Sequence, residues 1–510
     1  MPNGERNIAR DALASVVVFL VALPLCMGIA IASGMPPTAG IVTGIIGGII
    51  VGSLSGSPLT VSGPAAGLVV LVADMIHKFG VEMLAVIVLM AGLMQIMAGA
   101  FKMGNWFRAI SPAVIHGMLA GIGLLIIGSQ FHIMLDSTPL QSGFENLIDI
   151  PSAFMATLMS NGGNISAALI GILTIATIVL WTRYAPKQLK AVPGALVGVL
   201  LAMLAANLLD LQIKFVSDLF KESATIASLF DYSLPTWNRI QEAMSGELLL
   251  AIISLAFIAS AESLLSVTAV DKMHRGPRAK YDRELMAQGL GNSLCGILGA
   301  LPMTGVIVRS TANIQAGATS RASTILHGLW LLIFVWAFLF SFEYIPVATL
   351  AAVLVYTGYK LAYPKVLKEL WEYGKAEVAI YVITVMTIVL FDLLTGVIMG
   401  LALSLIKLVY IFAHLVVWVD YAKEGKITIH LKGSATFIEL PKLANVLESL
   451  APGREVTIQF DDLEFMDHAC IELIDNWQKQ YQATGGHAHI NWDTAISKYH
   501  QKNGRRAVFA

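Results

Sequence analysis

The sequence predicts a polytopic α-helical membrane protein with a small α/β domain near its C-terminal end. The chain has 510 residues, of which 56% are hydrophobic and 13% are charged. Soluble globular domains carry about 25% charged residues. Apolar runs of about 20 residues, long enough to cross a bilayer, recur from residue 13 to residue 418. We therefore expect a transmembrane domain at 1–420 and, where the composition changes, a soluble domain at 425–510.

Fourteen apolar runs are candidate spans, several of them short or interrupted. They lie at 13–33, 38–55, 61–77, 81–101, 113–134, 164–183, 191–209, 247–270, 286–300, 303–316, 322–342, 347–360, 377–391 and 393–418. With the N-terminus inside, sixteen loop lysines and arginines fall on the cytoplasmic side and four on the external side. This asymmetry satisfies the positive-inside rule. We therefore expect an even number of spans and cytoplasmic termini.

The residues after 425 show the periodicities of a soluble α/β fold. Segments 426–437 and 455–467 alternate apolar and polar residues, as half-buried strands do. Segments 438–450 and 468–486 have helical spacing, and the second ends at a Gly-Gly pair. A further strand is expected at 487–492. Because this domain follows an even number of spans, we expect it in the cytoplasm.

Glycines recur at four-residue spacing in the second expected span. They are Gly40, Gly44, Gly48, Gly52 and Gly56, and Gly117 and Gly121 repeat the spacing later in the chain. In a membrane helix this spacing gives a smooth face on which a neighbouring helix can pack closely. A nucleotide-binding loop would need a soluble strand–turn–helix around the glycines, and the sequence has none there. We therefore interpret this stripe as a helix-packing surface.

Composition and spacing argue against several classes of function. The formal net charge of −1 does not favour a nucleic-acid partner. Cys26, Cys295 and Cys470 lie far apart and have neither metal-ligand nor disulfide spacing. The spans contain no recognisable nucleophile–base pair or metal-ligand set. We expect a protein that is not an enzyme and that needs no metal or cofactor.

Two matching interruptions point to a binding site. Segments 56–72 and 299–314 each begin with Gly and Pro, continue with β-favouring residues and then reach a glycine that can open a short helix. They lie about half the membrane region apart, as broken helices do in transporters built from inverted repeats. Two half-helices that meet at the bilayer midplane direct free N–H groups and positive dipole ends at one point. Such a point can hold an anion.

The predicted anion contacts come from both interruptions and from the first span. They are Ser62, Pro64, Ala65, Ala66, Thr304, Gly305, Val306, Arg309 and Pro24. Arg309 would lie one turn into the second half-helix, and its guanidinium group keeps its charge. Intramembrane charge marks substrate paths. The alternative is a salt-bridged arginine that extends toward the membrane interface.

A second ionisable group, Glu262, lies midway along the preceding span, with Ser260, Ser263 and Ser266 nearby. Burial favours the protonated form of a carboxyl group, and a nearby cation opposes this effect. Glu262 could therefore carry a coupling proton, with Ser266 beside it. It could also neutralise Arg309, and the two interpretations are compatible.

The ordered motifs resemble the SulP anion transporters, bacterial relatives of solute carrier family 26. The resemblance rests on VSGP at 61–64, GxLPxTG at 299–305 and RST at 309–311. The C-terminal part resembles the STAS domain of that family. The resemblance implies a seven-plus-seven inverted repeat, with spans 1–4 and 8–11 as a mobile core and the others as a gate that dimerises. It further implies elevator-type transport of a small anion across a bacterial inner membrane.

Departures from the family pattern restrict the range of expected substrates and coupling ions. Leu25 after Pro24 resembles bicarbonate-transporting members rather than sulfate-like ones. Sodium-coupled bicarbonate members have aspartate at the position of Glu262, threonine at that of Ile307 and no arginine at that of Arg309. We therefore predict a secondary active transporter of bicarbonate, then sulfate or chloride, with proton rather than sodium coupling.

Several alternatives remain open. One is a dicarboxylate–proton symporter, a second is a sodium-coupled bicarbonate symporter, and a third is an anion channel of the same fold. A nucleobase carrier shares the repeat architecture but typically lacks a STAS domain. In the STAS-like domain, His468 stands where anti-sigma-factor antagonists carry a phosphorylatable serine, so we expect no phosphoryl switch there.

Overall fold

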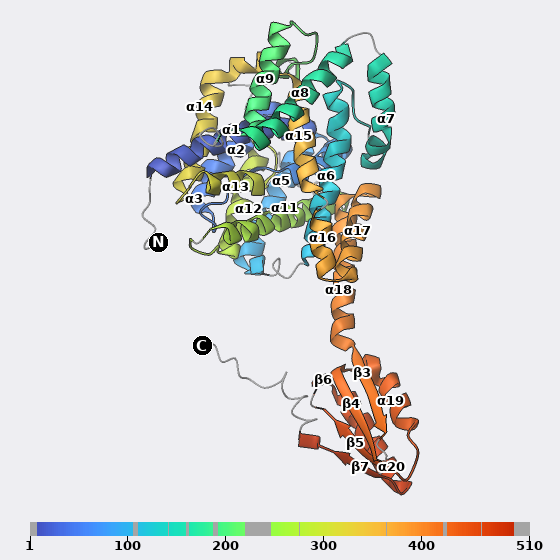
Figure 1. The fold of residues 1–510 in the computed structure, drawn as a ribbon. Coiled ribbons are helices and arrows are strands. Elements are labelled where there is room, and N and C mark those ends of the chain that lie inside the picture. The colour runs from blue at the N-terminus through green and yellow to red at the C-terminus, as the bar shows by residue number, and fades with distance from the viewer. Residues whose placement is uncertain are drawn as a thin grey trace. The chain divides into compact units, whose positions relative to one another are not determined.

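The chain forms two compact units, Met1–Leu401 and Ala402–Ala510. The computed structural model describes residues 8–105, 111–140, 142–159, 163–186, 192–219, 246–274, 276–363, 365–421, 426–460 and 462–493 (Figure 1). Residues 494–510 of the expected soluble domain lie outside this described part.

The first unit is a bundle of helices interrupted by two short strands. Its helices, together with the one that leads into the second unit, are α1 (Ile8–Ala32), α2 (Pro37–Ile46), α3 (Gly52–Leu54), α4 (Val69–Phe79), α5 (Val81–Ala100), α6 (Pro112–Met134), α7 (Gly143–Met159), α8 (Gly163–Tyr184), α9 (Gly194–Leu208), α11 (Gly246–Met273), α12 (Tyr281–Ile297), α13 (Ile307–Gln315), α14 (Ala322–Phe338), α15 (Val347–Leu361), α16 (Lys365–Glu372), α17 (Lys375–Leu390) and α18 (Leu393–Ala413). The strands are β1 (Ser62–Pro64) and β2 (Met303–Gly305).

Seven helical segments in the described part are long and apolar enough to cross a bilayer. They are Ile8–Ala32, Pro37–Leu54, Val81–Ala100, Pro112–Met134, Ile165–Tyr184, Gly246–Met273 and Leu393–Ile411. Two shorter apolar helices, α9 and α14, accompany them. The chain is therefore a multi-pass helical membrane protein, as the composition predicted. The expected count of fourteen spans remains a prediction.

The structure differs from the expected spans in three places. Helix α7 was not expected, because Pro151 and several polar residues break its apolar run. Helix α16 is only eight residues long and amphipathic, so it has no membrane-span signal. The last expected span, 393–418, is too long, because α18 ends at Ala413 and the following residues form a strand.

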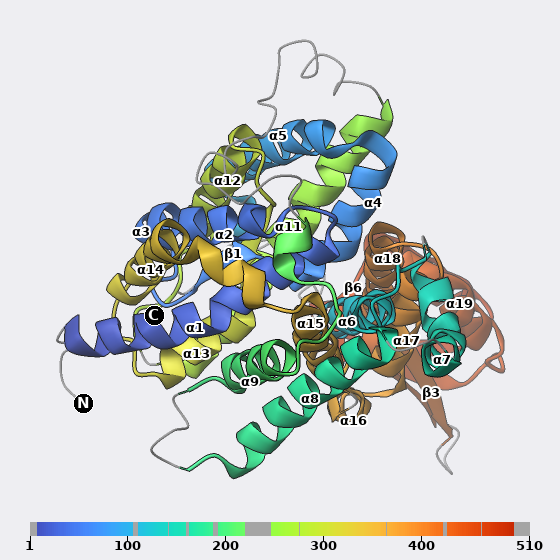
Figure 2. The same cartoon turned by 90° about the horizontal axis from the view of Figure 1, so that it is seen from above.

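The helices of the first unit pack in two groups. In one group, α5 packs against α11 and α12, and α1 packs against α2, α13 and α14. In the other, α6 packs against α7, α15 and α17, and α8 packs against α9 and α15. Figure 2 separates the groups: α5, α11, α12 and α14 lie on one side, and α6, α8, α15 and α17 lie on the other.

The predicted glycine stripe does allow close helix packing. A Cβ on Gly48 would lie 2.6 Å from Cα of Gly328 on α14. A Cβ on Gly40 would collide with the backbone of Cys26 on α1. Residues Gly47–Val51 form a π-helical turn, η1, between α2 and α3. Gly56 lies beyond α3 and approaches Lys280 instead, so the helical stripe ends at Gly52.

The second unit contains one sheet and two helices. Its elements are β3 (Leu415–Tyr421), β4 (Lys426–Ala435), α19 (Leu440–Glu448), β5 (Glu455–Gln459), β6 (Leu463–Met466), α20 (His468–Ala483) and β7 (His487–Ile490). The strand order is β3-β4-β5-β7, and β6 also pairs with β4. Strand β3 is antiparallel to β4, and the other pairs are parallel. A core that includes Leu443, Phe460, Ile474 and Trp477 lies within this unit.

Two features of this sheet correct the expected pattern. The expected strand at 455–467 is two strands, β5 and β6, which pair with different stretches of β4. Strand β3 was assigned to the last membrane span, because its valines and tryptophan extend the apolar run of α18. His468 begins α20, whose N-cap residue Asp467 accepts a hydrogen bond from Cys470 N–H at 2.9 Å.

Candidate functional site

The two interrupted segments meet as an antiparallel pair of strands. Ser62 on β1 pairs with Gly305 on β2, and Pro64 pairs with Met303. Beyond the pair, Val306 N–H donates to the carbonyl oxygen of Val61 at 2.9 Å. The correspondence predicted from the two Gly-Pro interruptions is thus a direct contact between segments far apart in the chain.

Each strand leads directly into the start of a helix. A 3-10 turn, η2 (Ala66–Leu68), follows β1 and continues into α4, and α13 follows β2. Ala65 and Val306 are the residues before these starts, and neither caps a helix N–H group with its side chain. The first N–H groups of a helix have no intrahelical partner. The start of α13 therefore remains available to an anion, whereas at η2 the amide of Gly67 is already bonded to the carboxyl group of Glu262.

Arg309 lies in the first turn of α13 and is fully buried, with 0% of its surface exposed. Its Nη2 donates to the carbonyl oxygen of Pro64 at 3.3 Å, whereas Nε and Nη1 have no hydrogen-bond partner in the described part of the chain. Nη1 lies against Gly63, where a side chain would collide with it. A buried guanidinium group without a counter-charge is costly, so this geometry favours an anion beside Arg309.

These contacts exclude two simpler interpretations of Arg309. A snorkelling arginine would expose its guanidinium group, whereas this group is buried. No carboxylate in the described residues, Glu262 included, forms an ion pair with Arg309. The charge therefore faces the site without a protein counter-ion.

Glu262 reaches the first half-helix from α11. Its carboxyl group contacts the backbone amide of Gly67 in η2, and its Oε2 is buried without a hydrogen-bond partner. A Cβ on Gly67 would lie 2.6 Å from Oε1 of Glu262, so a side chain there would displace the carboxyl group of Glu262. The next residue, Ser263, accepts a hydrogen bond from Gly305 N–H at 3.2 Å. Helix α11 therefore touches both interrupted segments.

The remaining predicted residues lie on or beside the strand pair. Ser62 and Thr304 are buried on β1 and β2. Ala65 is buried, while Ala66 and Val306 at the two helix starts are partly exposed. Pro24 is buried in α1, which packs against β1 and α13. Ser266 is buried on α11, one turn beyond Glu262.

Sequence reasoning missed several buried amides that hold β2 in place. Asn292 on α12 donates to Met303 O at 3.1 Å and accepts from Met303 N–H at 2.7 Å. It also donates to Gln95 on α5 at 2.7 Å, and Gln95 donates to Ser260 at 3.1 Å. An amide side chain inside an apolar span could have revealed these residues, because a buried amide needs a specific hydrogen-bond partner.

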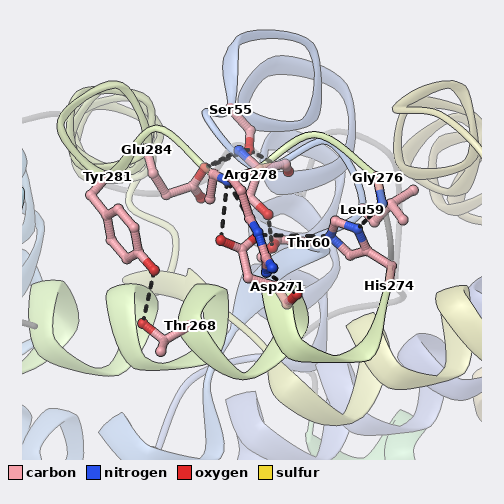
Figure 3. Close-up of polar contacts among 12 residues, drawn as sticks. Ser55, Leu59, Thr60, Thr268, Asp271, His274, Gly276, Arg278, Tyr281 and Glu284 are labelled. Carbon is pink, nitrogen blue, oxygen red and sulfur yellow. Dashed lines mark hydrogen bonds and ion pairs between the residues drawn. The ribbon is translucent and has the colours of Figure 1, made fainter. Parts of the chain in front are cut away.

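A separate polar cluster occupies the connection from α11 to α12 (Figure 3). Asp271 accepts hydrogen bonds from Ala279 N–H at 3.1 and 3.2 Å, and Arg278 donates to the Asp271 carbonyl oxygen at 2.8 Å. His274 Nε2 lies 3.7 Å from Asp271 Oδ1. Burial lowers the pKa of His274, although the Asp271 charge opposes this effect. These contacts order the connection between the two helices.

A buried arginine beside the starts of η2 and α13, inside an apolar helical bundle, is the arrangement expected of an anion-handling membrane transporter. The chain belongs to the sulfate permease family, whose model matches residues 8–384. One relative, "Putative sulfate transporter YvdB" of Bacillus subtilis, is 30% identical over 79% of this chain and 73% of its own length. Bicarbonate transporter BicA of Picosynechococcus is 25% identical over 78% of this chain and 69% of its own length.

Solved structures share the fold at lower sequence identity. The transmembrane domain of a cyanobacterial bicarbonate transporter, BicA, has a TM-score of 0.64 and 23% identity, over 77% of this chain and 97% of that one. Murine Solute Carrier 26 family member A9, an anion transporter in the inward-facing state, has a TM-score of 0.76 and 14% identity, over 97% of this chain and 88% of that one. The predicted family and helical transporter fold are therefore confirmed.

Proposed function

We propose that this protein is a secondary active transporter of a small inorganic anion, with bicarbonate the favoured substrate and sulfate or chloride next. The observation that carries the proposal is the buried guanidinium group of Arg309, which has two unpartnered nitrogen atoms in the first turn of α13, a helix start without a side-chain cap. An anion supplies the missing acceptors and the missing charge. The preference for bicarbonate is supported by Leu25 after Pro24 and by the similarity to BicA.

We further propose an elevator mechanism. Arg309, Glu262 and both strands belong to the helix group of α1–α5 and α11–α14. If that group moves as one body against α6–α9 and α15–α18, the anion site travels with it and keeps its own contacts. Spans 1–4 and 8–11 then act as the core, and the other spans act as the gate.

Proton coupling follows from charge and from the available ligands. An anion that enters a cell with a negative-inside potential moves uphill by about 2.3 kcal/mol per charge per 100 mV, so accumulation needs a co-transported cation. Glu262 can carry a proton, because one carboxylate oxygen is buried without a partner and burial favours the neutral form. Ile307 offers no side-chain oxygen to sodium. We assign Glu262 and Ser266 to the coupling site.

The remaining assignments concern the membrane location of the transporter, the role of its second unit and its oligomeric state. The loop charges support cytoplasmic termini, and the bacterial relatives support the plasma (inner) membrane of a bacterium. The second unit, with its mixed sheet and two helices, resembles a STAS domain. We propose that it assists regulation or assembly, and that a homodimer forms through the gate and this unit.

Reconstituted protein tests the substrate and the coupling ion together. Uptake of bicarbonate, sulfate, chloride and fumarate is measured in parallel into proteoliposomes, with a proton gradient and no sodium and then with sodium and no proton gradient. We expect accumulation of bicarbonate with the proton gradient alone. Accumulation only with sodium would overturn proton coupling, and preference for fumarate would replace the inorganic substrate with a dicarboxylate.

The first variant tests the anion site. Arg309→Gln keeps most of the side-chain volume and removes the charge, so uptake should fall by about 100-fold or more, as expected when one partner of a buried charge pair is lost. Arg321→Gln is the matched control, because Arg321 binds the backbone carbonyls of Ser53 and Ser55 rather than the strand pair. Normal uptake by well-folded Arg309→Gln protein would remove the arginine from the site.

A further inference from the structure

Glu284 is a buried carboxylate that the proposed transport mechanism does not use. It lies on α12 with 0% of its surface exposed. Ser55 Oγ donates to its Oε2 at 2.5 Å (Figure 3), and Ser57 N–H donates to the same oxygen at 3.1 Å. Among the described residues, no lysine, arginine or histidine forms an ion pair with it. The carboxylate is therefore bonded by neutral donors. A third donor, described next, also contacts the strand pair.

That third donor is the side-chain amide of Gln288, one turn further along α12. Its Nε2 donates to Glu284 Oε1 at 2.9 Å and to Ser62 Oγ at 2.7 Å. Its Oε1 is buried without a partner. A carboxylate can only accept hydrogen bonds, so Glu284 fixes which way the amide of Gln288 faces. The reverse orientation would place the amide oxygen against a carboxylate oxygen.

This orientation determines the role of the Ser62 hydroxyl group. Because Ser62 Oγ accepts from Gln288, its own hydrogen must be directed elsewhere. No acceptor for that hydrogen is present among the residues that the structure describes. Ser62 pairs with Gly305 at the centre of the strand crossing, and the amide of Gln288 lies 3.8 Å from the position of a Cβ on Gly305. The hydrogen is therefore not held by a protein acceptor at the strand crossing, on the face of the strand pair toward α12.

We propose that Glu284 is a positioning residue that acts through Gln288 to present Ser62 as a hydrogen-bond donor to the transported anion. The inference rests on the proposed function, since it deepens the description of the same site. An anion accepts hydrogen bonds, and a donor whose direction is already set does not have to reorient when the anion arrives. We call the chain Glu284–Gln288–Ser62 the relay; it joins a carboxylate outside the anion site to one of the proposed anion contacts.

A double-mutant cycle tests this relay. Ser62→Ala should raise KM for the anion about tenfold, the usual cost of losing a hydrogen bond to a charged group, with a smaller effect on kcat. Glu284→Gln should raise KM similarly, because its new amide can donate to Gln288 Oε1 and let Gln288 accept from Ser62. The double variant should be no worse than Ser62→Ala alone, since both changes remove one interaction.

A second variant breaks the relay without removing Glu284. Gln288→Met keeps the side-chain length, adds no charge and cannot donate to Ser62, so the Ser62 hydroxyl loses its fixed direction; KM should rise by up to about tenfold, and the change should add nothing to Ser62→Ala. Thr268→Val is the control on the same pair of helices: its hydroxyl lies 3.3 Å from Tyr281 and takes no part in the relay. It should leave KM within about twofold of the unmodified protein. Thermal melting in detergent establishes that each variant is folded.

The possible results separate the relay from the site itself. If Ser62→Ala leaves KM unchanged, Ser62 is not an anion contact and the proposed site is wrong at that position. If Ser62→Ala weakens binding but Glu284→Gln and Gln288→Met do not, the relay is wrong while the site stands. Effects that multiply in the double variants would likewise show that Glu284 acts independently of Ser62.

Discussion

Arg309 is buried at the strand crossing and Glu262 is partly exposed there, with one carboxylate oxygen buried, and the two side chains form no ion pair with each other. Arg309 bonds to the segment around β1 through Pro64, and Glu262 contacts the same segment through Gly67. Each group thus leaves part of its bonding capacity unused. Two charges that neutralised each other would have little differential affinity for an anion or a proton. Their separation allows each to respond to its own ligand.

At the scale of the residue, Glu262→Gln tests the coupling role. The amide mimics the protonated carboxyl group, so the variant should retain anion binding and anion exchange. Accumulation of the anion driven by a proton gradient should fall at least about tenfold, because net accumulation, unlike exchange, requires a group that binds and releases a proton. Exchange and gradient-driven uptake are compared in the same proteoliposomes.

The matched control for this experiment is Glu247→Gln. Glu247 lies in the first turn of the same helix and is exposed, so gradient-driven uptake should remain normal. If Glu262→Gln still accumulates the anion with a proton gradient, another group carries the proton.

At the scale of the element, the contact between η1 and α14 depends on two glycines, Gly48 and Gly328, that face each other. Gly48→Ala should lower the free energy of unfolding by about 1–3 kcal/mol, the usual cost of overpacking. The added Cβ would lie 2.6 Å from Cα and 2.7 Å from N of Gly328, and neither backbone atom can turn away. Thermal unfolding in detergent measures the change.

Gly246→Ala provides the comparison. A Cβ at Gly246 meets nothing within 4 Å, so its melting temperature should stay close to that of the unmodified protein. Equal stability of the two variants would mean that the helices separate easily at Gly48.

The helix starts at the site could be predicted because their causes are local. Glycine, proline and β-favouring residues repeat in the two interrupted segments, and a helix that begins after an extended residue leaves its N–H groups free. The roles of Gln288 and Asn292 could not be predicted in the same way. Their partners, Ser62, Gln95 and Met303, are chosen by tertiary packing. Similarly, the apolar sequence of β3 predicts a membrane helix, and only its pairing with β4 shows that it is a strand.

At the scale of the whole molecule, the chain contains two units with separate cores. The candidate anion site lies wholly within the first. A chain that ends after Ala413, the last residue of α18, should therefore bind the anion with an affinity within about twofold of the full chain. Calorimetry on the two purified proteins measures this difference. A truncated protein that is folded but cannot bind would assign the second unit a direct part in the site.

The pairing of β1 with β2 also has a consequence for how the protein is made. Ser62 leaves the ribosome long before Gly305, and at about 5–20 residues per second the interval is on the order of ten seconds or more. During that time β1 has no partner strand, and unpaired backbone groups are not tolerated in lipid. The first interrupted segment must therefore wait, shielded by neighbouring helices or by the insertion machinery, until the second arrives. The binding site is completed only when both halves of the sequence have been synthesised.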